Sequence, residues 1–293
     1  MSDPETVIRN LPVWSGPVTV EPLAGGLSNA NFTVAEADGT RRMVRLGADL
    51  PFHHVFRGQE ARVSRAAHAA GVSPALLHAG DGAMVFEFLD AHTFEADDVR
   101  GEWRRILPLL RRCHDEVGRH LTGPAPFFWV FHVIRDYAAT LRAGGSRMAG
   151  ELPRFLEIAG RLEAAQVAMP VVFGHHDLLP ANLMDDGGRL WLVDWEYGGF
   201  GTPLFDLANL AGNAGLPPDD ERAMLEAYFG QAPSPALWRA YGAMKVASLL
   251  RETLWSLVSE LHMSAPGVDY AAYTAENLDR FRAALSEFEE SEG

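Results

Sequence analysis

The chain has 293 residues, of which 47% are hydrophobic, so it is long enough for two lobes around a shared cleft and excludes disordered and collagen-like classes. Its formal net charge of −14 argues against a nucleic-acid partner, which would need a surface of clustered Lys and Arg. An acidic balance suits a cationic substrate without establishing one.

Three short apolar stretches near the start predict antiparallel strands: 19–23, 31–35 and 42–46. The loop between the first two reads AGGLSNAN. Gly25 and Gly26 remove side chains where backbone must approach a ligand, and this suits a loop folded over nucleotide phosphates. Ser28 and Asn29 add hydrogen-bond donors. A plain hairpin turn would use the same residues, so both interpretations stay open.

The next segments complete a small first lobe. Ala and Arg content predicts a helix over 59–70, which ends at Gly71. The stretch AMVFEFL, 83–89, predicts a last strand, and we place the lobe boundary around Asp90. Beyond it the periodicity is helical, and we expect helices over these ranges: 103–117, 128–141, 152–168, 218–229, 235–260 and 271–289.

The stretch 173–196, FGHHDLLPANLMDDGGRLWLVDWE, predicts a hairpin in the middle of the second lobe. The residues DDGG, 185–188, form a turn cluster, and LWLV then returns as an apolar strand. With the turn centred on the glycines, Asn182 lies opposite Val193.

This register brings two oxygen-bearing side chains to one end of the hairpin. Asp194 then lies beside Asn182 at a Cα spacing of roughly 5 Å. Carboxylate and amide oxygens in such an arrangement suit Mg²⁺, which binds one or two protein oxygens together with substrate phosphates. Asp177, upstream on the same loop, is left to accept a proton.

The motifs in this stretch carry a resemblance. HHDLLPAN resembles the catalytic loop of the kinase superfamily, and DWE occupies the place of the DFG triplet. The longer string VDWEYGGFGTPLFDLANL resembles the bacterial choline kinase branch of the aminoglycoside phosphotransferase and choline/ethanolamine kinase families. The resemblance implies an α+β, bilobal protein kinase-like fold, with a small antiparallel-sheet lobe with one helix (1–90) and a larger, mostly helical lobe (91–293).

The resemblance also implies ATP and Mg²⁺ as cofactors and gives roles to residues of the first lobe. Arg45 would hold the α and β phosphates, and Glu60 would pair with it, whereas the bland alternatives are a surface strand arginine and an exposed helix glutamate. Arginine must serve here because Lys245 is the only lysine of the chain. Backbone groups of Glu87 and Leu89 would face adenine.

In the second lobe, His175 would fix the catalytic loop and Asp177 would act as the base. His176 would fill a variable position. Asp206 would brace the loop, unless it is a helix N-cap. Cys113, with His114 beside it, is read as a packing residue.

The resemblance places six side chains around the acceptor: Glu196, Tyr197, Glu252, Trp255, Tyr270 and Tyr273. Aromatic faces attract a cationic amino alcohol, such as choline or ethanolamine. Eukaryotic choline kinases carry a second tryptophan where this chain has Glu252, and residues three apart share a helix face, so Glu252 and Trp255 would meet one ligand. The alternative is a core Trp255 and a surface Glu252.

Two rivals remain open from the motifs alone: an amino sugar or aminoglycoside kinase of the same fold, and a nucleotide-binding pseudokinase. A serine hydrolase is set aside because no GxSxG elbow occurs. The histidine pairs 53–54 and 175–176 do not indicate zinc, since adjacent side chains rarely converge on one metal.

The single cysteine excludes an intrachain disulfide framework and predicts a reducing, cytoplasmic location. No stretch of 18 uninterrupted apolar residues occurs, so no membrane partner is expected. Nothing in the pattern indicates a particular oligomeric state.

Overall fold

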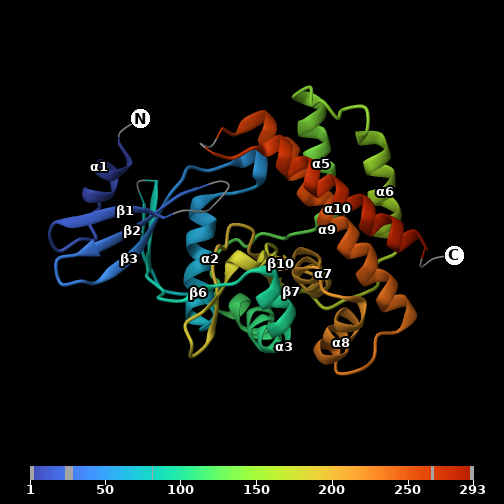
Figure 1. The fold of residues 1–293 in the computed structure, drawn as a ribbon, viewed down its shortest axis with the longest axis horizontal. Helices are drawn as coiled ribbons and strands as arrows, with labels where there is room; N and C mark the ends of the chain where they lie inside the picture. Colours follow the sequence, from blue (N-terminus) through green and yellow to red (C-terminus); the bar gives the residue numbers. More distant parts are fainter. Residues whose placement is uncertain (1–2, 24–28, 81, 265–266, 291–293) are drawn as a thin grey trace.

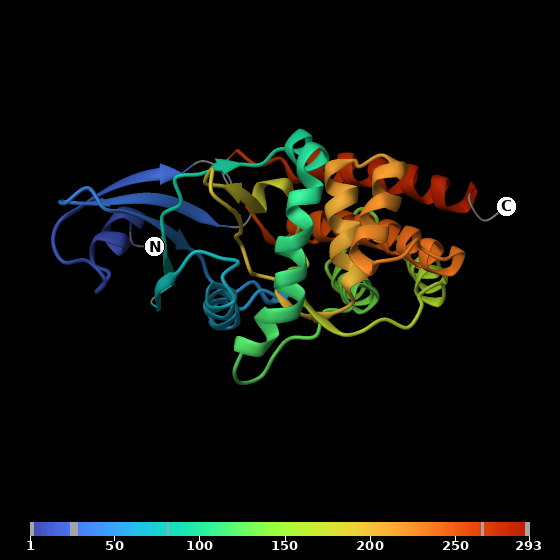
Figure 2. The ribbon, with the colours of Figure 1, turned by 90° about the horizontal axis from the view of Figure 1, so that it is seen from below.

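The computed structural model describes residues 3–23, 29–80, 82–264 and 267–290. A small sheet-containing lobe lies at one end of the molecule and a larger helical lobe at the other, with α2 (Arg57–Ala69) between them (Figures 1 and 2). Three residues of the predicted glycine-rich loop, Gly25, Gly26 and Ser28, lie outside the described residues.

The small lobe is built on an antiparallel sheet of order β1-β2-β3-β5-β4. Its strands are β1 (Val18–Leu23), β2 (Ala30–Glu36), β3 (Arg41–Leu46), β4 (Leu76–Gly80) and β5 (Ala83–Glu87). The predicted strands are all present, within one or two residues at their ends. Sequence reasoning missed β4, whose pairing with β5 shifts register between Leu76 and His78 and so breaks the alternation that marks a regular strand.

Two short helices accompany α2 in this part of the chain, α1 (Pro4–Arg9) and the 3₁₀ turn η1 (Pro51–His53). Buried valines and a phenylalanine of β1, β2, β3 and β5 pack with Ile8 of α1 into a core of their own. The opposite side of the sheet faces α2, where Ala61 meets Met84 and Phe86 of β5.

The chain leaves the small lobe at the end of β5. It then forms β6 (His92–Thr93), which pairs with β8 (Leu183–Asp185) of the catalytic hairpin in the other lobe. This crossing supports the predicted boundary at Asp90, which stays a prediction.

The large lobe is organised around α9, which packs against α5, α6, α7 and α10. Its helices are α3 (Ala96–Arg112), η2 (Cys113–Val117), α4 (Gly118–His120), α5 (Val130–Ala143), α6 (Leu152–Ala164), α7 (Pro203–Ala214), α8 (Pro218–Phe229), α9 (Pro235–His262) and α10 (Tyr270–Glu290). Within the described ranges, no helix is both long and apolar enough to span a bilayer.

One helix of this lobe, α7, was not predicted. Thr202 caps it by accepting a bond from the Leu204 N–H, and Pro203 stands at its first position. Thr followed by Pro is a helix-start signal that was present in the sequence. The remaining predicted helices are found, with ends displaced by up to seven residues at the start of α3.

The catalytic stretch forms small β elements between the lobes: β7 (Val172–Gly174), η3 (Pro180–Asn182), β8 (Leu183–Asp185), β9 (Leu190–Leu192) and β10 (Gly199–Gly201). The predicted register is confirmed, because the Val193 N–H donates to the Asn182 carbonyl at 3.0 Å. Asp186 closes the turn by accepting bonds from the N–H groups of Gly188 and Arg189, both at 2.8 Å.

Candidate active site

A cavity of about 510 Å³ lies between the lobes. Residues predicted from three distant parts of the chain line it: Arg45, Asp177, Asn182, Asp194, Glu252 and Trp255. Glu87 and Leu89 line it as well, next to Phe86. The backbone N–H of Glu87 donates to the Ala75 carbonyl at 2.9 Å, so the contribution of Glu87 to adenine binding stays a prediction.

The loop before Asp177 is held from below by Asp206 of α7, which is fully buried. Its carboxylate accepts the backbone N–H groups of His175 and His176, each at 2.8 Å, and the Nε2 of His114 lies 3.0 Å from Oδ2. Thr202 is the N-cap of α7, so the alternative role for Asp206 is wrong. His114 is therefore more than a packing residue.

The two adjacent histidines fix this loop without lining the cavity. Nε2 of His175 lies 2.9 Å from the Val193 carbonyl, which ties the loop to the returning strand. His176 is not at a loosely constrained position: it is fully buried, stacks on Phe128 with ring centroids 4.3 Å apart, and its Nδ1 lies 3.1 Å from the Tyr197 carbonyl. Burial lowers the pKa of His176 to about 4, which keeps the ring neutral.

Asp177 reaches the cavity with 18% of its side chain exposed. The amide nitrogen of Asn182 donates to the Asp177 carbonyl at 2.8 Å, which leaves Oδ1 as the ligand atom of this amide. Burial raises the pKa of Asp177, and the guanidinium of Arg251, 3.7 Å away, opposes that rise. A higher pKa makes the ionised carboxylate a stronger base, which suits it to accept a hydroxyl proton.

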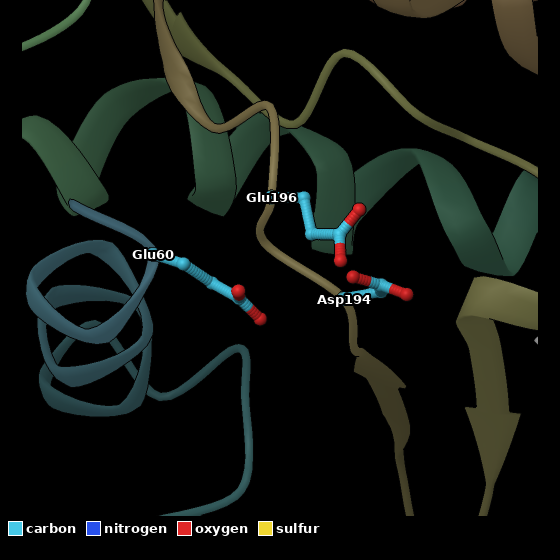
Figure 3. Close-up of side chains that lie close together, drawn as sticks. All are labelled: Glu60, Asp194 and Glu196. Carbon is cyan, nitrogen blue, oxygen red and sulfur yellow. The ribbon is translucent and has the colours of Figure 1, made fainter. Parts of the chain in front are cut away.

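A cluster of charged side chains closes one end of the cavity, where the nucleotide is predicted to bind. Nη1 of Arg45 donates to Glu60 Oε1 at 2.6 Å and to Asp194 Oδ1 at 2.7 Å. Oxygens of Glu60, Asp194 and Glu196 lie within 4.8 Å of one another, and Figure 3 shows the three carboxylates pointing together from α2 and from the segment after β9. Burial raises the pKa of Glu60 to about 7, against the opposing effect of Arg45.

This cluster and the predicted metal pair share only Asp194. Carboxylate and amide oxygens of both sets fit Mg²⁺ by their chemistry. Glu60 and Asp194 are both bonded to Arg45, but Glu60 is only 1% exposed, whereas Asp194 is 25% exposed and, like Asn182, lines the cavity. We therefore keep the pair Asn182 and Asp194 as the predicted metal ligands.

The segment Asp194–Trp195–Glu196 turns sharply at its first residue. Asp194 has a φ of 67°, a left-handed conformation that is uncommon outside glycine and found often at functional sites. Trp195 is 1% exposed, and its indole N–H donates to Ser73 Oγ at 3.0 Å. A buried anchor thus separates two carboxylates that both face the cavity.

Glu196, predicted at the acceptor, is bonded toward the small lobe instead. Its Oε1 accepts bonds from the Asn29 amide and from Arg57 Nη1, both at 2.6 Å. Asn29 in turn accepts a bond from Arg57 Nη2 at 2.7 Å. Both Glu196 and Asn29 line the cavity, so neither ligand role is tested by these contacts, but sequence reasoning missed Arg57.

The acceptor end is aromatic and buried. The indole N–H of Trp255 donates to the Tyr197 hydroxyl at 2.9 Å, and His53 stacks on the indole with centroids 4.6 Å apart. The guanidinium of Arg251 lies over the Tyr197 ring at 4.4 Å and donates to Glu252 at 2.8 Å. Glu252 and Trp255 therefore share one wall, as their helical spacing predicts.

The two remaining predicted aromatics stand behind this wall. The Tyr273 hydroxyl donates to Glu252 Oε1 at 2.8 Å, so Tyr273 orients the carboxylate. Tyr270 is 7% exposed and does not line the cavity. A direct substrate role for either tyrosine stays a prediction.

Residues 19–245 match the family described as "Phosphotransferase enzyme family". The chain belongs to this family. The predicted phosphotransferase class is thereby confirmed at the level of the family.

The phosphotransferase resembles several proteins, two of which are named for ethanolamine kinase or for the choline/ethanolamine kinase family. It is 25% identical to protein LicA of Haemophilus influenzae, over 90% of this chain and 79% of the relative. It is 29% identical to a probable ethanolamine kinase of Arabidopsis thaliana, over 65% of this chain but only 55% of the relative. A choline/ethanolamine kinase family protein of Mesorhizobium loti has a solved structure that superimposes with a TM-score of 0.78, at 28% identity, over 98% of this chain and 96% of that one.

These likenesses confirm the predicted bilobal kinase-like fold of this phosphotransferase. Three side chains at its site were missed: His53, Arg57 and Arg251. Arg57 precedes Glu60 by three residues in the first turn of a helix, a spacing that signals an ion pair. No comparable local signal marks His53, because its contacts are with residues of α9, about 200 positions away in the sequence.

Proposed function

We propose that the chain transfers the γ-phosphoryl group of ATP, with Mg²⁺, to the hydroxyl of a small amino alcohol of the choline or ethanolamine type. One observation carries the proposal: a single cavity joins the Arg45 cluster, the Asp177 loop and the aromatic acceptor wall. The cytoplasm stays the predicted location, and the only cysteine, Cys113, is buried and unpaired.

The order of groups along the cavity supports phosphoryl transfer. Arg45 offers a permanently charged guanidinium to the phosphates. Asn182 and Asp194 would hold Mg²⁺, which neutralises developing charge on the transferred group. Asp177 has Asn182 at 3.4 Å on one side and Arg251, the partner of Glu252, at 3.7 Å on the other. There it would orient the acceptor hydroxyl and take its proton.

The acceptor wall supports a small onium group. Trp255 and Tyr197 offer aromatic surface to a cation, and Glu252 lies beside them with both oxygens already bonded, one to Arg251 and one to Tyr273. Because both oxygens of this carboxylate already have partners, it would attract the cation through its negative charge rather than form a new salt bridge. A polycationic aminoglycoside would instead need several unengaged carboxylates around it.

The direct test is ADP release from ATP and Mg²⁺ over a panel of acceptors: choline, ethanolamine, amino sugars and aminoglycosides. We expect turnover with a small amino alcohol. The phosphorus NMR spectrum should then show the signal of the corresponding phosphomonoester. Faster turnover with an amino sugar or aminoglycoside would replace the proposed acceptor. Tight ATP binding without ADP release for every acceptor would favour a pseudokinase.

A further inference from the structure

Arg57, the first residue of α2, joins three segments of the chain at the nucleotide end of the cavity. Its Nη1 donates to Glu60 Oε2 and to Glu196 Oε1, both at 2.6 Å. Its Nη2 donates to Asn29 Oδ1 at 2.7 Å, and its Nε donates to the Ala48 carbonyl at 3.0 Å. Only 14% of the side chain is exposed.

The fold is shaped to admit this guanidinium. A Cβ at Gly47 would lie 2.7 Å from Asn29 Oδ1 and 3.1 Å from Arg57 Nη2, so a side chain at this position would push the pair apart. The backbone N–H of Arg57 is itself fixed by Asp49 Oδ1 at 2.7 Å. Arg57 is therefore placed by its backbone, its neighbours and the space left by a glycine.

The charges around Arg57 show what it balances. When all are ionised, Glu60, Asp194 and Glu196 face two arginines, so the cluster carries one uncompensated negative charge. Nη1 of Arg45 serves Glu60 and Asp194 closely but lies 3.9 Å from Glu196. Among the described cations, Arg57 is thus the close partner of Glu196.

We infer that Arg57 is a positioning residue that holds Glu60 and Glu196 in place while Asp194 alone is released to a nucleotide-bound metal ion. The inference rests on the proposed function. One oxygen of Glu60 accepts a bond from Arg45 and the other from Arg57. Glu60 therefore keeps one partner when Arg45 binds phosphate. Without Arg57, the three converging carboxylates become a trap for a divalent cation that needs no nucleotide.

The test compares Arg57→Met with a matched control, Arg62→Met, on the same helix and exposed to solvent, where Arg62 bonds the Pro124 carbonyl. Mn²⁺ alone serves as the probe, and its free concentration is read by EPR without nucleotide or acceptor. We expect Arg57→Met to bind Mn²⁺ at least about tenfold more tightly than the wild type, because one positive charge leaves the cluster. We expect its kcat to fall by about 10- to 100-fold, as for other residues that orient metal ligands.

Two further variants keep the inference testable. Arg57→Lys retains the charge but loses the planar set of guanidinium donors. Mn²⁺ affinity should therefore stay near the wild-type value while kcat falls. Adding Glu196→Gln to Arg57→Met should return Mn²⁺ affinity toward wild type, which a merely structural role for Arg57 would not produce. Arg57 variants with the Mn²⁺ affinity and kcat of Arg62→Met would overturn the inference. Because Mn²⁺ binding needs no alcohol, this failure is distinct from finding no acceptor.

Discussion

The two ends of the cavity are held together by different forces. At the nucleotide end, short ion pairs connect Arg45 to Glu60 and Asp194. At the acceptor end, Trp255 is fixed by ring stacking on His53 and by one hydrogen bond to the Tyr197 hydroxyl.

This difference indicates how each end meets its ligand. A metal ion would bind Asp194 and phosphates would bind Arg45, so the ion pair between these two residues must be exchanged when the nucleotide binds. At the acceptor end, the groups are bonded to one another, Trp255 to Tyr197 and Arg251 to Glu252, so we expect this end to be preformed. We expect substitutions at the first end to change kcat and those at the second to change KM.

The largest loss of activity is expected for Asp177→Asn, which keeps the shape of the loop and removes the base. We expect kcat to fall by about 10²- to 10⁴-fold, the usual effect of losing a positioned base. Steady-state kinetics with saturating ATP measure it, and Asp115→Asn, exposed on η2, is the control. Full activity in Asp177→Asn would remove this assignment.

Asp194→Asn tests the metal role at the same end. Asparagine tolerates the left-handed backbone, so the fold should persist while a charged metal ligand is lost. We expect single-turnover phosphorylation to need far higher Mg²⁺, with kcat lowered by at least about tenfold. An unchanged Mg²⁺ dependence would contradict the ligand role.

Trp255→Leu probes the preformed end. Loss of the aromatic face should raise KM for the amino alcohol by about 2- to 30-fold, since a cation–π contact contributes about 0.5 to 2 kcal/mol. KM for ATP should hardly change. Trp238→Leu on the same helix, distant from the cavity lining, reports the cost of removing an indole from α9. Equal effects of both variants on the alcohol KM would reduce Trp255 to a core residue.

The smallest effect concerns pH and His53. Burial lowers the pKa of His53 to about 3, from an ordinary value of 6.5, with the charge of Arg251 acting in the same direction. Below about pH 6.5 the unfolded chain binds a proton that folded His53 does not, so the free energy of unfolding decreases as pH falls toward the folded pKa.

His53→Phe keeps a ring against Trp255 and removes this titration. We expect its unfolding free energy to depend less steeply on pH between 6 and 4, by up to about 1.4 kcal/mol per pH unit. Urea unfolding at several pH values measures the slope. His132→Gln, exposed on α5, should leave the wild-type slope unchanged. The same slope in His53→Phe would show that another group is responsible.

Local patterns were enough to predict much of this phosphotransferase. The hairpin register followed from turn residues and alternation, and it correctly placed Asn182 opposite Val193. The helix α8 was found at its observed ends, Pro218 and Phe229, where a proline begins the helix and Gly230 follows it. The order of motifs identified the fold.

The missed features depend on contacts between distant segments. Arg57 bonds Glu196 across 139 positions, and His53 bonds Ser259 across 206 positions, so no window of sequence contains either pair. The resemblance placed Glu196 at the acceptor with its neighbour Tyr197, but the chain turns at these two residues, where the Gly198 N–H donates to the Trp195 carbonyl, and Glu196 is bonded to Arg57.

The short segment between β3 and α2 has a consequence for engineering. His53 belongs by sequence to the first lobe, yet it stacks on Trp255 and bonds Ser259, both on α9. A chimaera that receives its first ninety residues from a relative would therefore take from that relative both its glycine-rich loop and the residue that stacks on the indole. The alcohol preference of such a chimaera should therefore depend on both source proteins, because one supplies the residue at position 53 and the other supplies α9.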